Sequence, residues 1–319
     1  MKAAVNYVNG PPSVLVYEDV PDPVVGPADV LIRVEAISLE GGDLLSRLLV
    51  TPPTTPHIVG YQAAGVVEVV GAEVRSIRVG QRVAAFHWAG SHAELFAVPE
   101  SLVYPVPDAL DIKVASTVPV AFGTADDALF DFGKLQAGET VLINGAAGGV
   151  GIAAVQLAKA AGARVIGTAS TDERLARLSE FGLDEGINYK TTDVVGETLR
   201  LTGGNGVDLL VDLAGGSGAT GLAHAIRHRG RFSVVGAASG MPTFGFMDII
   251  SRGLTLLGVY FGQEMHLDRV HTMIDGHMQA LAEGRLRMPI DKTFPLAEAA
   301  AAHEYAETGH PFGRVVLIP

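Results

Sequence analysis

The chain has 319 residues, of which 48% are apolar and 18% charged, and its net charge is −12. This composition excludes a disordered chain, and the lack of a basic stripe argues against binding to nucleic acid. The sequence contains no cysteine, which excludes disulfides and thiolate zinc sites.

Residues 1–115 are predicted to form a compact β-rich domain. Short Val-rich segments at 29–38, 63–71, 81–88 and 93–99 are separated by Pro and Gly, which is typical of such domains. The length of the whole chain, at about 150 residues per domain, predicts about two domains. A second domain is therefore expected after this one.

From about residue 118, strands and helices alternate. We predict strands at 139–145, 164–170, 207–215, 231–237 and 254–261, and helices at 148–163, 172–182 and 219–230. Continuously apolar strands between helices indicate an α/β fold, with a doubly wound parallel sheet covered on both faces. Two further helices at 266–284 and 296–309 precede a last strand at 313–319. The predicted plan is a nucleotide-binding domain at 121–260, inserted between a β-rich domain at 1–120 and its completion at 261–319.

The segment VLINGAAGGVG, residues 141–151, lies where a dinucleotide-binding loop is expected, between the first of these strands and a long helix. Its pattern is Ala146-x-Gly148-x-x-Gly151, with Ala in place of the usual first glycine. Gly148 allows the backbone to approach a pyrophosphate, and Gly151 allows close packing of the helix. The free N–H groups of the helix N-terminus favour an anion. We expect the loop residues to bind the cofactor: Ala146, Ala147, Gly148, Gly149, Val150 and Gly151.

The end of the next strand indicates which nucleotide binds. NAD sites place Asp or Glu there, whereas this chain has Ala169 followed by Ser170. A 2′-phosphate would meet no repulsion, and Arg174, one turn into the next helix, can bind it through a charge-assisted hydrogen bond. We therefore expect NADPH rather than NADH. As alternatives, Ser170 forms a capping box with Glu173, Arg174 is a solvated helix residue, or Asp172 reaches a ribose hydroxyl.

Several segments together resemble the medium-chain dehydrogenase/reductase superfamily, in its zinc-free quinone oxidoreductase (zeta-crystallin-like) branch. They are MKAAV, the run AAGVVEVVG after Gly60, VGQRVAAF, NGAAGGVGIAAVQLAKAAGARVIGTAS, INYK, GRFSVVGAASG and GRVVLIP. The resemblance covers nearly the whole chain. It implies a GroES-like catalytic domain, a Rossmann domain that binds the cofactor, and a homodimer.

The resemblance also implies further cofactor-binding residues. Tyr189 of INYK is expected beside the 2′-phosphate, together with Ser170 and Arg174. Thr124 matches a threonine near the nicotinamide. The segments that would flank the nicotinamide half of the cofactor contain Gly236, Ala237, Val259 and Phe261.

The sequence departs from its zinc-dependent relatives at the position of their catalytic metal. Those relatives have GHE where this chain has GYQ at 60–62, and their catalytic cysteine corresponds to Glu40. Glu40 and Gln62 alone are too few ligands for Zn²⁺, so we expect no metal. Quinone reductases usually have N-x-x-D where this chain has Glu40-Gly41-Gly42-Asp43. Asp43 matches that pattern and Glu40 does not.

Without zinc, hydride transfer to a conjugated acceptor is easier than oxidation of a simple alcohol. Tyr61, Glu40 and Gln62 are the expected catalytic residues: Tyr61 or Glu40 donates a proton and Gln62 orients the acceptor. Asp43, Tyr61 and Trp88 are expected to bind the substrate. As alternatives, Glu40 and Gln62 only satisfy each other or backbone groups, Tyr61 only fills the pocket, and Trp88 is a half-buried core residue.

These residues predict an NADPH-dependent reductase of quinones or α,β-unsaturated carbonyls. An enoyl-thioester or specialised biosynthetic reductase is a second interpretation, and a protein that binds NADPH without turnover is a third. No apolar run reaches the roughly 18 residues of a membrane span, and the opening MKAAVNYVNGPPS lacks the apolar core of a signal peptide. We therefore expect a cytoplasmic protein that acts on a small molecule and not on nucleic acid or membranes.

Overall fold

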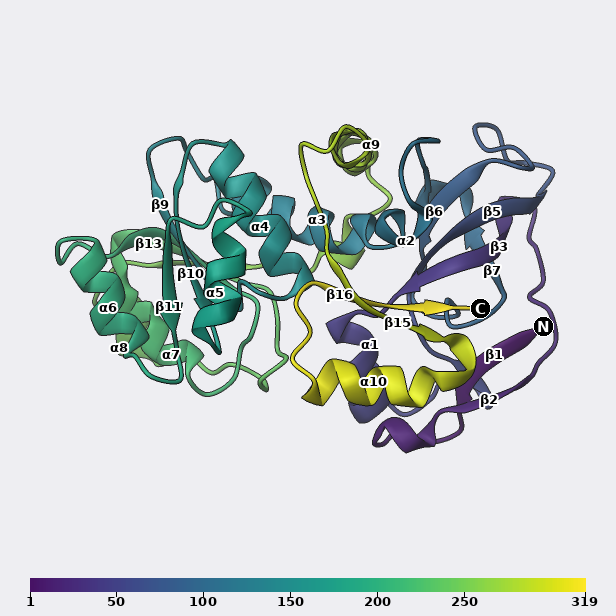
Figure 1. Ribbon diagram of the computed structural model, residues 1–319, viewed down its shortest axis with the longest axis horizontal. Helices are drawn as coiled ribbons and strands as arrows, with labels where there is room; N and C mark the ends of the chain where they lie inside the picture. The colour runs from purple at the N-terminus through teal and green to yellow at the C-terminus, as the bar shows by residue number, and fades with distance from the viewer. The chain divides into compact units, whose positions relative to one another are not determined.

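The computed structural model describes residues 1–319, which form two compact units. The terminal unit consists of Met1–Val120 and Gly262–Pro319, and the central unit of Ala121–Phe261. In Figure 1 the terminal unit therefore contains both the purple and the yellow ends of the chain. No helix in either unit is both long and apolar enough to span a bilayer.

The terminal unit is built on two sheets. A three-stranded sheet has the order β2-β1-β4, and a seven-stranded sheet has the order β15-β16-β3-β5-β6-β8, with β7 also pairing with β3. The strands are β1 Lys2–Asn6, β2 Val16–Asp19, β3 Asp29–Ser38, β4 His57–Ile58, β5 Gln62–Val70, β6 Arg82–Phe86, β7 Leu95–Pro99, β8 Val103–Pro105, β15 Ile290–Pro295 and β16 Arg314–Ile318. The helices are α1 Gly41–Leu49, α2 Ile112–Ala115, α9 Asp268–Ala282 and α10 Ala299–Thr308.

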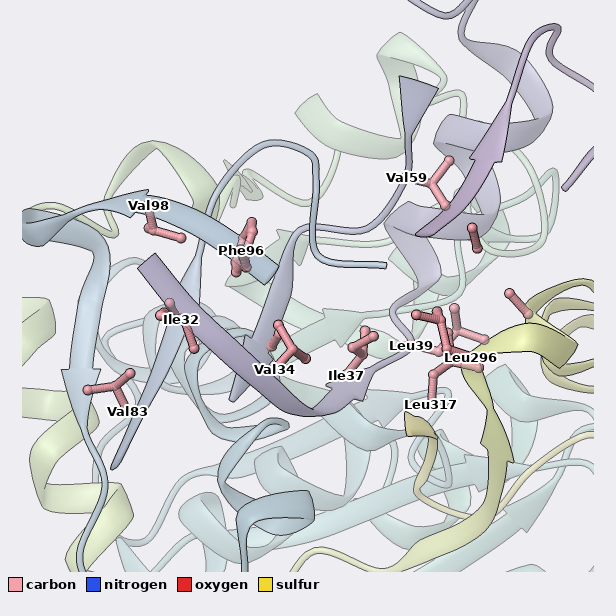
Figure 2. Packing of buried hydrophobic residues seen from close by; sticks show 14 of the residues in the cluster. Ile32, Val34, Ile37, Leu39, Val59, Val83, Phe96, Val98, Leu296 and Leu317 are labelled. Carbon is pink, nitrogen blue, oxygen red and sulfur yellow. The ribbon is translucent and has the colours of Figure 1, made fainter. Parts of the chain in front are cut away.

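A buried apolar cluster joins the strands of the larger sheet. Ile32, Val34 and Ile37 of β3 belong to it, together with Phe96 of β7 and Leu317 of β16. Figure 2 shows these side chains along the three strands. Because β16 comes from the end of the chain and β3 from its beginning, burial of this cluster joins the two termini in one core.

The central unit is a six-stranded parallel sheet in the order β11-β10-β9-β12-β13-β14. Numbered within the unit, this is the order 3-2-1-4-5-6 of the doubly wound dinucleotide-binding fold. The strands are β9 Thr140–Asn144, β10 Arg164–Ala169, β11 Glu185–Asn188, β12 Val207–Asp212, β13 Ile226–Val234 and β14 Thr255–Gly258. The helices are α3 Val118–Asp126, which begins just before the unit, α4 Gly149–Ala160, α5 Asp172–Ser179, α6 Val194–Leu201, α7 Ala219–Leu222 and α8 Phe246–Ile250.

Helices α4 and α5 contact β9, β10 and β11, whereas α6, α7 and α8 gather around the short helix η4, Ala223–Ala225. The structure confirms the predicted α/β fold with a doubly wound parallel sheet. The order reverses between β9 and β12, so a ligand is expected outside the carboxyl ends of these strands.

The helix predicted at 219–230 was wrong in its second half. Helical structure ends at Ala225, and β13 begins at Ile226. Ile226 is buried in the core, but the next four residues, Arg-His-Arg-Gly, offer no apolar side chain to continue a buried helical face. Ile226 pairs with Val207 of β12, and after a shift in register the pairing resumes with Arg231 opposite Leu209.

Candidate functional site

The predicted phosphate loop lies at the carboxyl end of β9. Gly145 has a φ of +85°, a conformation that favours glycine, and the Ala146 N–H donates to the carbonyl of Thr168 over 3.0 Å. Gly148 is the N-cap of α4 and is exposed, and Gly149 and Val150 begin the helix. The first N–H groups of a helix have no partner within it. The loop therefore presents donors to an anion, which fits a dinucleotide pyrophosphate.

Gly148 and Gly151 differ in the space around them. A Cβ atom on Gly151 would lie 2.4 Å from the carbonyl oxygen of Gly145, closer than any side chain allows. On Gly148 the nearest atom, the same oxygen, would be 3.8 Å away. Gly151 therefore lets α4 pack under the loop, whereas Gly148 leaves the outer surface of the loop open to a ligand.

A polar network at the ends of three neighbouring strands supports this loop, and it was not predicted from the sequence. The Asn144 side-chain amide donates to Asp212 Oδ1 (2.8 Å) and its oxygen accepts from the Thr168 hydroxyl (2.7 Å). Thr168 Oγ1 in turn accepts from the Gly145 N–H (3.0 Å), and Asp212 Oδ1 also accepts from the backbone of Ala214 (3.0 Å). The available signal was a polar residue at or near the carboxyl end of three adjacent parallel strands.

The residues predicted to hold the 2′-phosphate lie at the ends of β10 and β11. The Tyr189 N–H donates to the carbonyl of Ala169 (3.2 Å), which places Tyr189 beside Ser170. Arg174 Nη2 lies 3.5 Å from the carbonyl oxygen of Ala147 in the phosphate loop. The structure thus brings Ser170, Arg174 and Tyr189 around one end of the loop.

The structure bears on two alternatives near the end of β10, a capping box of Ser170 with Glu173 and a contact of Asp172 with a ribose hydroxyl. Thr171, not Ser170, is the N-cap of α5, and its side chain accepts from the Arg174 N–H. The capping box of Ser170 with Glu173 is therefore wrong. The carboxylate of Asp172 accepts a hydrogen bond from the Asn188 side chain over 2.9 Å, so it is held toward β11.

Gly236 and Ala237 follow β13. The Gly236 N–H donates to the carbonyl of Asp212 over 3.1 Å. A Cβ atom on the neighbouring Gly215 would lie 2.6 Å from the Gly236 carbonyl oxygen and 2.9 Å from Ala237 Cα. These two predicted residues therefore lie at the carboxyl end of the sheet, on the side of β12 away from the phosphate loop.

The other residues predicted near the nicotinamide are Thr124, Val259 and Phe261. Thr124 is partly exposed on α3. Val259 is buried and continues the pairing of β14, since its N–H donates to the carbonyl of Val234 (3.0 Å). The Phe261 ring packs where a side chain on Gly123 would otherwise lie. Phe261 and Thr124 therefore lie close to each other.

The expected catalytic residues of the terminal unit meet at the edge where β16 joins β3. Val316 pairs with Ser38, and the Leu39 N–H donates to the carbonyl of Val315. Extending this antiparallel register brings Arg314 opposite Glu40. Arg314 Nη1 lies 2.5 Å from Glu40 Oε2, and both side chains are buried. Arg314 was missed; its signal was a single basic residue at the start of an apolar last strand.

Glu40 also has two neutral hydrogen-bond donors. The Ser38 hydroxyl (2.8 Å) and the Gln62 amide (2.5 Å) both donate to its Oε1. The oxygen of Gln62 accepts from the Val120 N–H over 3.0 Å, so both ends of this amide are occupied. Burial raises the pKa of Glu40 to about 7, although Arg314 and the hydrogen bonds act in the opposite direction.

Asp43 and Tyr61 lie next to Glu40. Asp43 is buried in the first turn of α1, where its Oδ2 accepts from the Glu40 N–H over 2.8 Å. A Cβ atom on Gly42 would lie 2.7 Å from the Tyr61 hydroxyl oxygen, so this hydroxyl lies against α1 beside Asp43. Burial raises the pKa of Asp43 and of Tyr61 well above their ordinary values, and Glu40 adds to both shifts.

The ring of Tyr61 is the first of three aromatic rings in successive edge-on contact. Its ring lies edge-on to Phe86 at 5.7 Å, and Phe86 lies edge-on to Trp88 at 5.3 Å. Trp88 is 50% exposed, and Tyr61 is partly accessible, whereas Glu40 and Asp43 are buried. The accessible members of this group are therefore aromatic, and the two carboxyls are buried.

Comparison with known proteins identifies the family. Residues 26–108 match the family described as "Alcohol dehydrogenase GroES-like domain", and residues 149–276 match "Zinc-binding dehydrogenase". A quinone oxidoreductase of Pseudomonas aeruginosa is 34% identical over 318 residues, covering 97% of each chain. The chain belongs to the medium-chain dehydrogenase/reductase superfamily, in its quinone oxidoreductase branch. The predicted GroES-like domain is thereby confirmed.

Other members of this superfamily are also similar over the full length. A 2-haloacrylate reductase of a Burkholderia species is 33% identical over 331 residues, covering 99% of this chain and 98% of its own. The crystal structure of Escherichia coli quinone oxidoreductase complexed with NADPH has a TM-score of 0.95 at 26% identity and covers 100% of both chains.

Zinc, which one matched family name implies, does not fit the residues of this member of the superfamily. Glu40 is bonded to the guanidinium of Arg314, a group that cannot coordinate a metal. Both ends of the Gln62 amide are held by protein groups. No group of three or more His, Cys, Asp or Glu residues has a metal-binding arrangement. The donor set therefore lacks the three or four nitrogen, sulfur or carboxylate ligands that zinc requires.

Proposed function

We propose that the protein is an NADPH-dependent, zinc-independent reductase of quinones or α,β-unsaturated carbonyl compounds. The proposal rests above all on one observation: Glu40, with a pKa raised to about 7, is buried beside Asp43 and the partly accessible Tyr61. Reduction of a conjugated acceptor needs a hydride and a proton. This group can offer the proton, because burial raises the pKa of Asp43 and of Tyr61 and so favours their protonated forms.

The central unit supports NADPH as the cofactor, which when bound supplies the hydride. The loop at Gly148 presents N–H donors. Ser170 and Tyr189 follow the ends of β10 and β11, and Arg174 of α5 lies 3.5 Å from the carbonyl oxygen of Ala147 in the loop. No acidic side chain takes the place of Ala169 or Ser170 to repel a 2′-phosphate. A structural neighbour with the same fold binds NADPH. We propose that the other predicted cofactor residues contact its nicotinamide half: Thr124, Gly236, Ala237, Val259 and Phe261.

We propose different roles for the predicted catalytic residues. Tyr61, the only one of the three that is not fully buried as a residue, is the proton donor, and its hydroxyl binds the acceptor oxygen. Gln62 positions Glu40 and does not touch the acceptor, because both ends of its amide are occupied. Trp88 supplies a flat apolar surface for a planar acceptor. Asp43 lies beside the Tyr61 hydroxyl and supports its role as a donor.

A screen of NADPH oxidation over quinones, enones and enoyl thioesters tests this function. We expect turnover with quinones or enones, and faster oxidation of NADPH than of NADH. Slow oxidation with every acceptor would favour the alternative of a protein that binds NADPH without turnover. Faster turnover of enoyl thioesters than of all other acceptors would favour the biosynthetic alternative.

One similarity favours a second class of acceptor. The name of the 2-haloacrylate reductase describes reduction of an α,β-unsaturated carboxylate, and that protein is 33% identical to this chain. Adding unsaturated acids to the same screen would show whether the acceptor must be neutral. The buried negative charge at Glu40 leads us to expect neutral acceptors to react faster.

We also propose that the protein is a homodimer. The edge strand of the central sheet, β14, has unpaired backbone groups on one side. Large apolar side chains are exposed on it or near it: Phe246, Met247, Leu256 and Tyr260. Such a patch is typical of an interface. Sedimentation velocity is expected to show a dimer, and Leu256→Lys is expected to shift it toward the monomer.

A further inference from the structure

The proposed proton-donating group contains two buried carboxyls but only one cation that contacts them. The other buried arginine of this region, Arg47 on α1, is paired with Glu307. Glu40 and Asp43 are 2% and 1% exposed, and Arg314 is 6% exposed. The groups that face them are Ser38 from β3, Gln62 from β5, Tyr61 before β5 and Arg314 from β16. Buried charges must be balanced. One guanidinium balances one carboxylate, so the other carboxyl stays protonated.

The hydrogen bonds distinguish the two carboxyls. Glu40 has a partner on each oxygen: Arg314 at Oε2 (2.5 Å), and Ser38 and Gln62 at Oε1 (2.8 and 2.5 Å). Asp43 has only backbone donors: its Oδ2 accepts from the Glu40 N–H, and the Tyr61 N–H also stabilises its charged form, while its Oδ1 is buried and has no partner at hydrogen-bond geometry. A bare carboxylate oxygen is far more costly to bury than a neutral hydroxyl. The negative charge therefore belongs on Glu40 and the proton on Asp43.

We propose that Arg314 is a positioning residue that fixes Glu40 as the carboxylate and leaves the proton on Asp43, which then serves Tyr61 as its proton source. The inference deepens the proposed function and rests on it for its chemical purpose. Arg314 acts through Glu40 and touches neither acceptor nor cofactor. Asp43, predicted only to bind substrate, becomes the buried acid of the site.

The proton balance is simple. The reduction adds one hydride, supplied by NADPH, and one proton to the acceptor. The O–H bond of Tyr61 breaks as its proton goes to the acceptor oxygen, and the resulting phenolate takes the proton of Asp43. A carboxyl can act across one intervening water. Asp43 is then protonated again from solvent, while Glu40 keeps its charge throughout. The raised pKa of Asp43 keeps the proton there between turnovers.

Infrared spectroscopy tests the charge assignment without any reaction. Protein labelled with 13C at the carboxyl carbon of either aspartate or glutamate is compared with unlabelled protein at about pH 8, above the raised pKa of Glu40. We expect a protonated-carboxyl band that shifts with the aspartate label and is lost in Asp43→Asn. Asp19→Asn, an exposed carboxyl in the same unit, should keep the band. Glu40 is the only buried glutamate, so a band that shifts with the glutamate label would overturn the assignment.

The pH dependence of turnover tests the role of Arg314. In Glu40→Gln the guanidinium has only Asp43 to neutralise it, so Asp43 ionises more readily and the rate should fall at lower pH than in the wild type. The double variant Glu40→Gln, Arg314→Met removes both charges, so the alkaline fall in rate should return to the wild-type pH or above. An identical profile in the single and double variants would overturn the proposal.

The proposed function and this inference can fail separately. The infrared band is measured on the protein without acceptor or cofactor, so its result does not depend on the outcome of the acceptor screen. If the variants of Glu40 fold poorly, judged by circular dichroism, the isotope comparison in the wild type still decides which carboxyl is protonated. For Asp43→Asn we expect about 100-fold lower turnover, typical of a lost general acid, with NADPH binding unchanged. Unchanged turnover would remove Asp43 from the proton path.

Discussion

The guanidinium of Arg314 lies 2.5 Å from the carboxyl of Glu40, in the interior of the terminal unit. The two residues come from opposite ends of the chain, and the pairing of β16 with β3 brings them together. This ion pair occupies the position that corresponds, by resemblance, to the catalytic metal of zinc-dependent relatives. The carboxyl that corresponds to a zinc ligand is thus paired with a protein cation, and the proposed proton transfer takes place beside this pair.

Tyr61→Phe removes the hydroxyl that lies against Gly42 while keeping the ring and its edge-on contact with Phe86. We expect turnover to fall by about 100-fold, the usual effect of losing a general acid, with little change in NADPH affinity. Steady-state kinetics and a fluorescence titration of NADPH measure the two effects. Tyr17→Phe, at an exposed position, is the control. Unchanged turnover would mean that Tyr61 only fills the pocket.

Arg174→Ala removes the cation expected to bind the 2′-phosphate. A charge-assisted hydrogen bond contributes about 1.5–3 kcal/mol, so the Kd for NADPH should rise about 10- to 100-fold while that for NADH stays the same. Arg177→Ala, on the next turn of α5, is a control of equal charge at an exposed position. Equal affinities of the wild type for NADPH and NADH would contradict the phosphate site.

Gly148→Ala and Gly151→Ala should separate cofactor binding from stability. A side chain on Gly148 meets no protein atom closer than 3.8 Å, so the fold should keep its stability while NADPH binding weakens. On Gly151 it would meet the Gly145 carbonyl oxygen at 2.4 Å, so the free energy of unfolding should fall by at least about 1 kcal/mol. Thermal melting with and without NADPH distinguishes them. Equal melting temperatures of the two variants without cofactor would contradict this account.

The ionisation of Glu40 should make stability depend on pH. Because the folded pKa, about 7, lies above the ordinary value of 4.5, the folded state binds the proton more tightly than the unfolded state. Glu40 alone should therefore decrease the free energy of unfolding by about 3 kcal/mol as pH rises from 4.5 to about 7. Asp43, whose folded pKa is also raised, adds a decrease of the same sign that continues up to its own folded pKa. Urea denaturation across this range measures the decrease, which should be smaller in Glu40→Gln. The same decrease in both proteins would assign it to other groups.

The phosphate loop could be predicted because its signals are local. A buried strand, a glycine-rich turn and a long apolar helix are adjacent in the sequence, and the structure places the loop from Gly145 to Gly148 at the predicted strand end. The fold of the central unit follows from the alternation of such elements. The prediction failed at 226–230, where β13 begins with Ile226 paired to Val207 of β12 and the register shifts before Arg231.

Helix α1 was not predicted, for a tertiary reason. It begins with Gly41 and Gly42, which are poor helix formers, and these glycines hide the amphipathic pattern that follows them. The structure explains Gly42, since a side chain there would collide with the Tyr61 hydroxyl at 2.7 Å. The helix start and the tyrosine depend on each other, although they are separated in the sequence.

The sequence by itself determined the fold class, the loop at Gly148 and the polar residues at 40, 43, 61 and 62, because periodicity and short motifs depend on neighbouring residues. Only the tertiary structure decided how those polar residues are used. Arg314 reaches Glu40 through strand pairing between the two ends of the chain, and Gln62 is occupied by Glu40 and Val120. Because both carboxyls are buried, the single cation that contacts them can neutralise only one. No local sequence pattern reveals this charge balance.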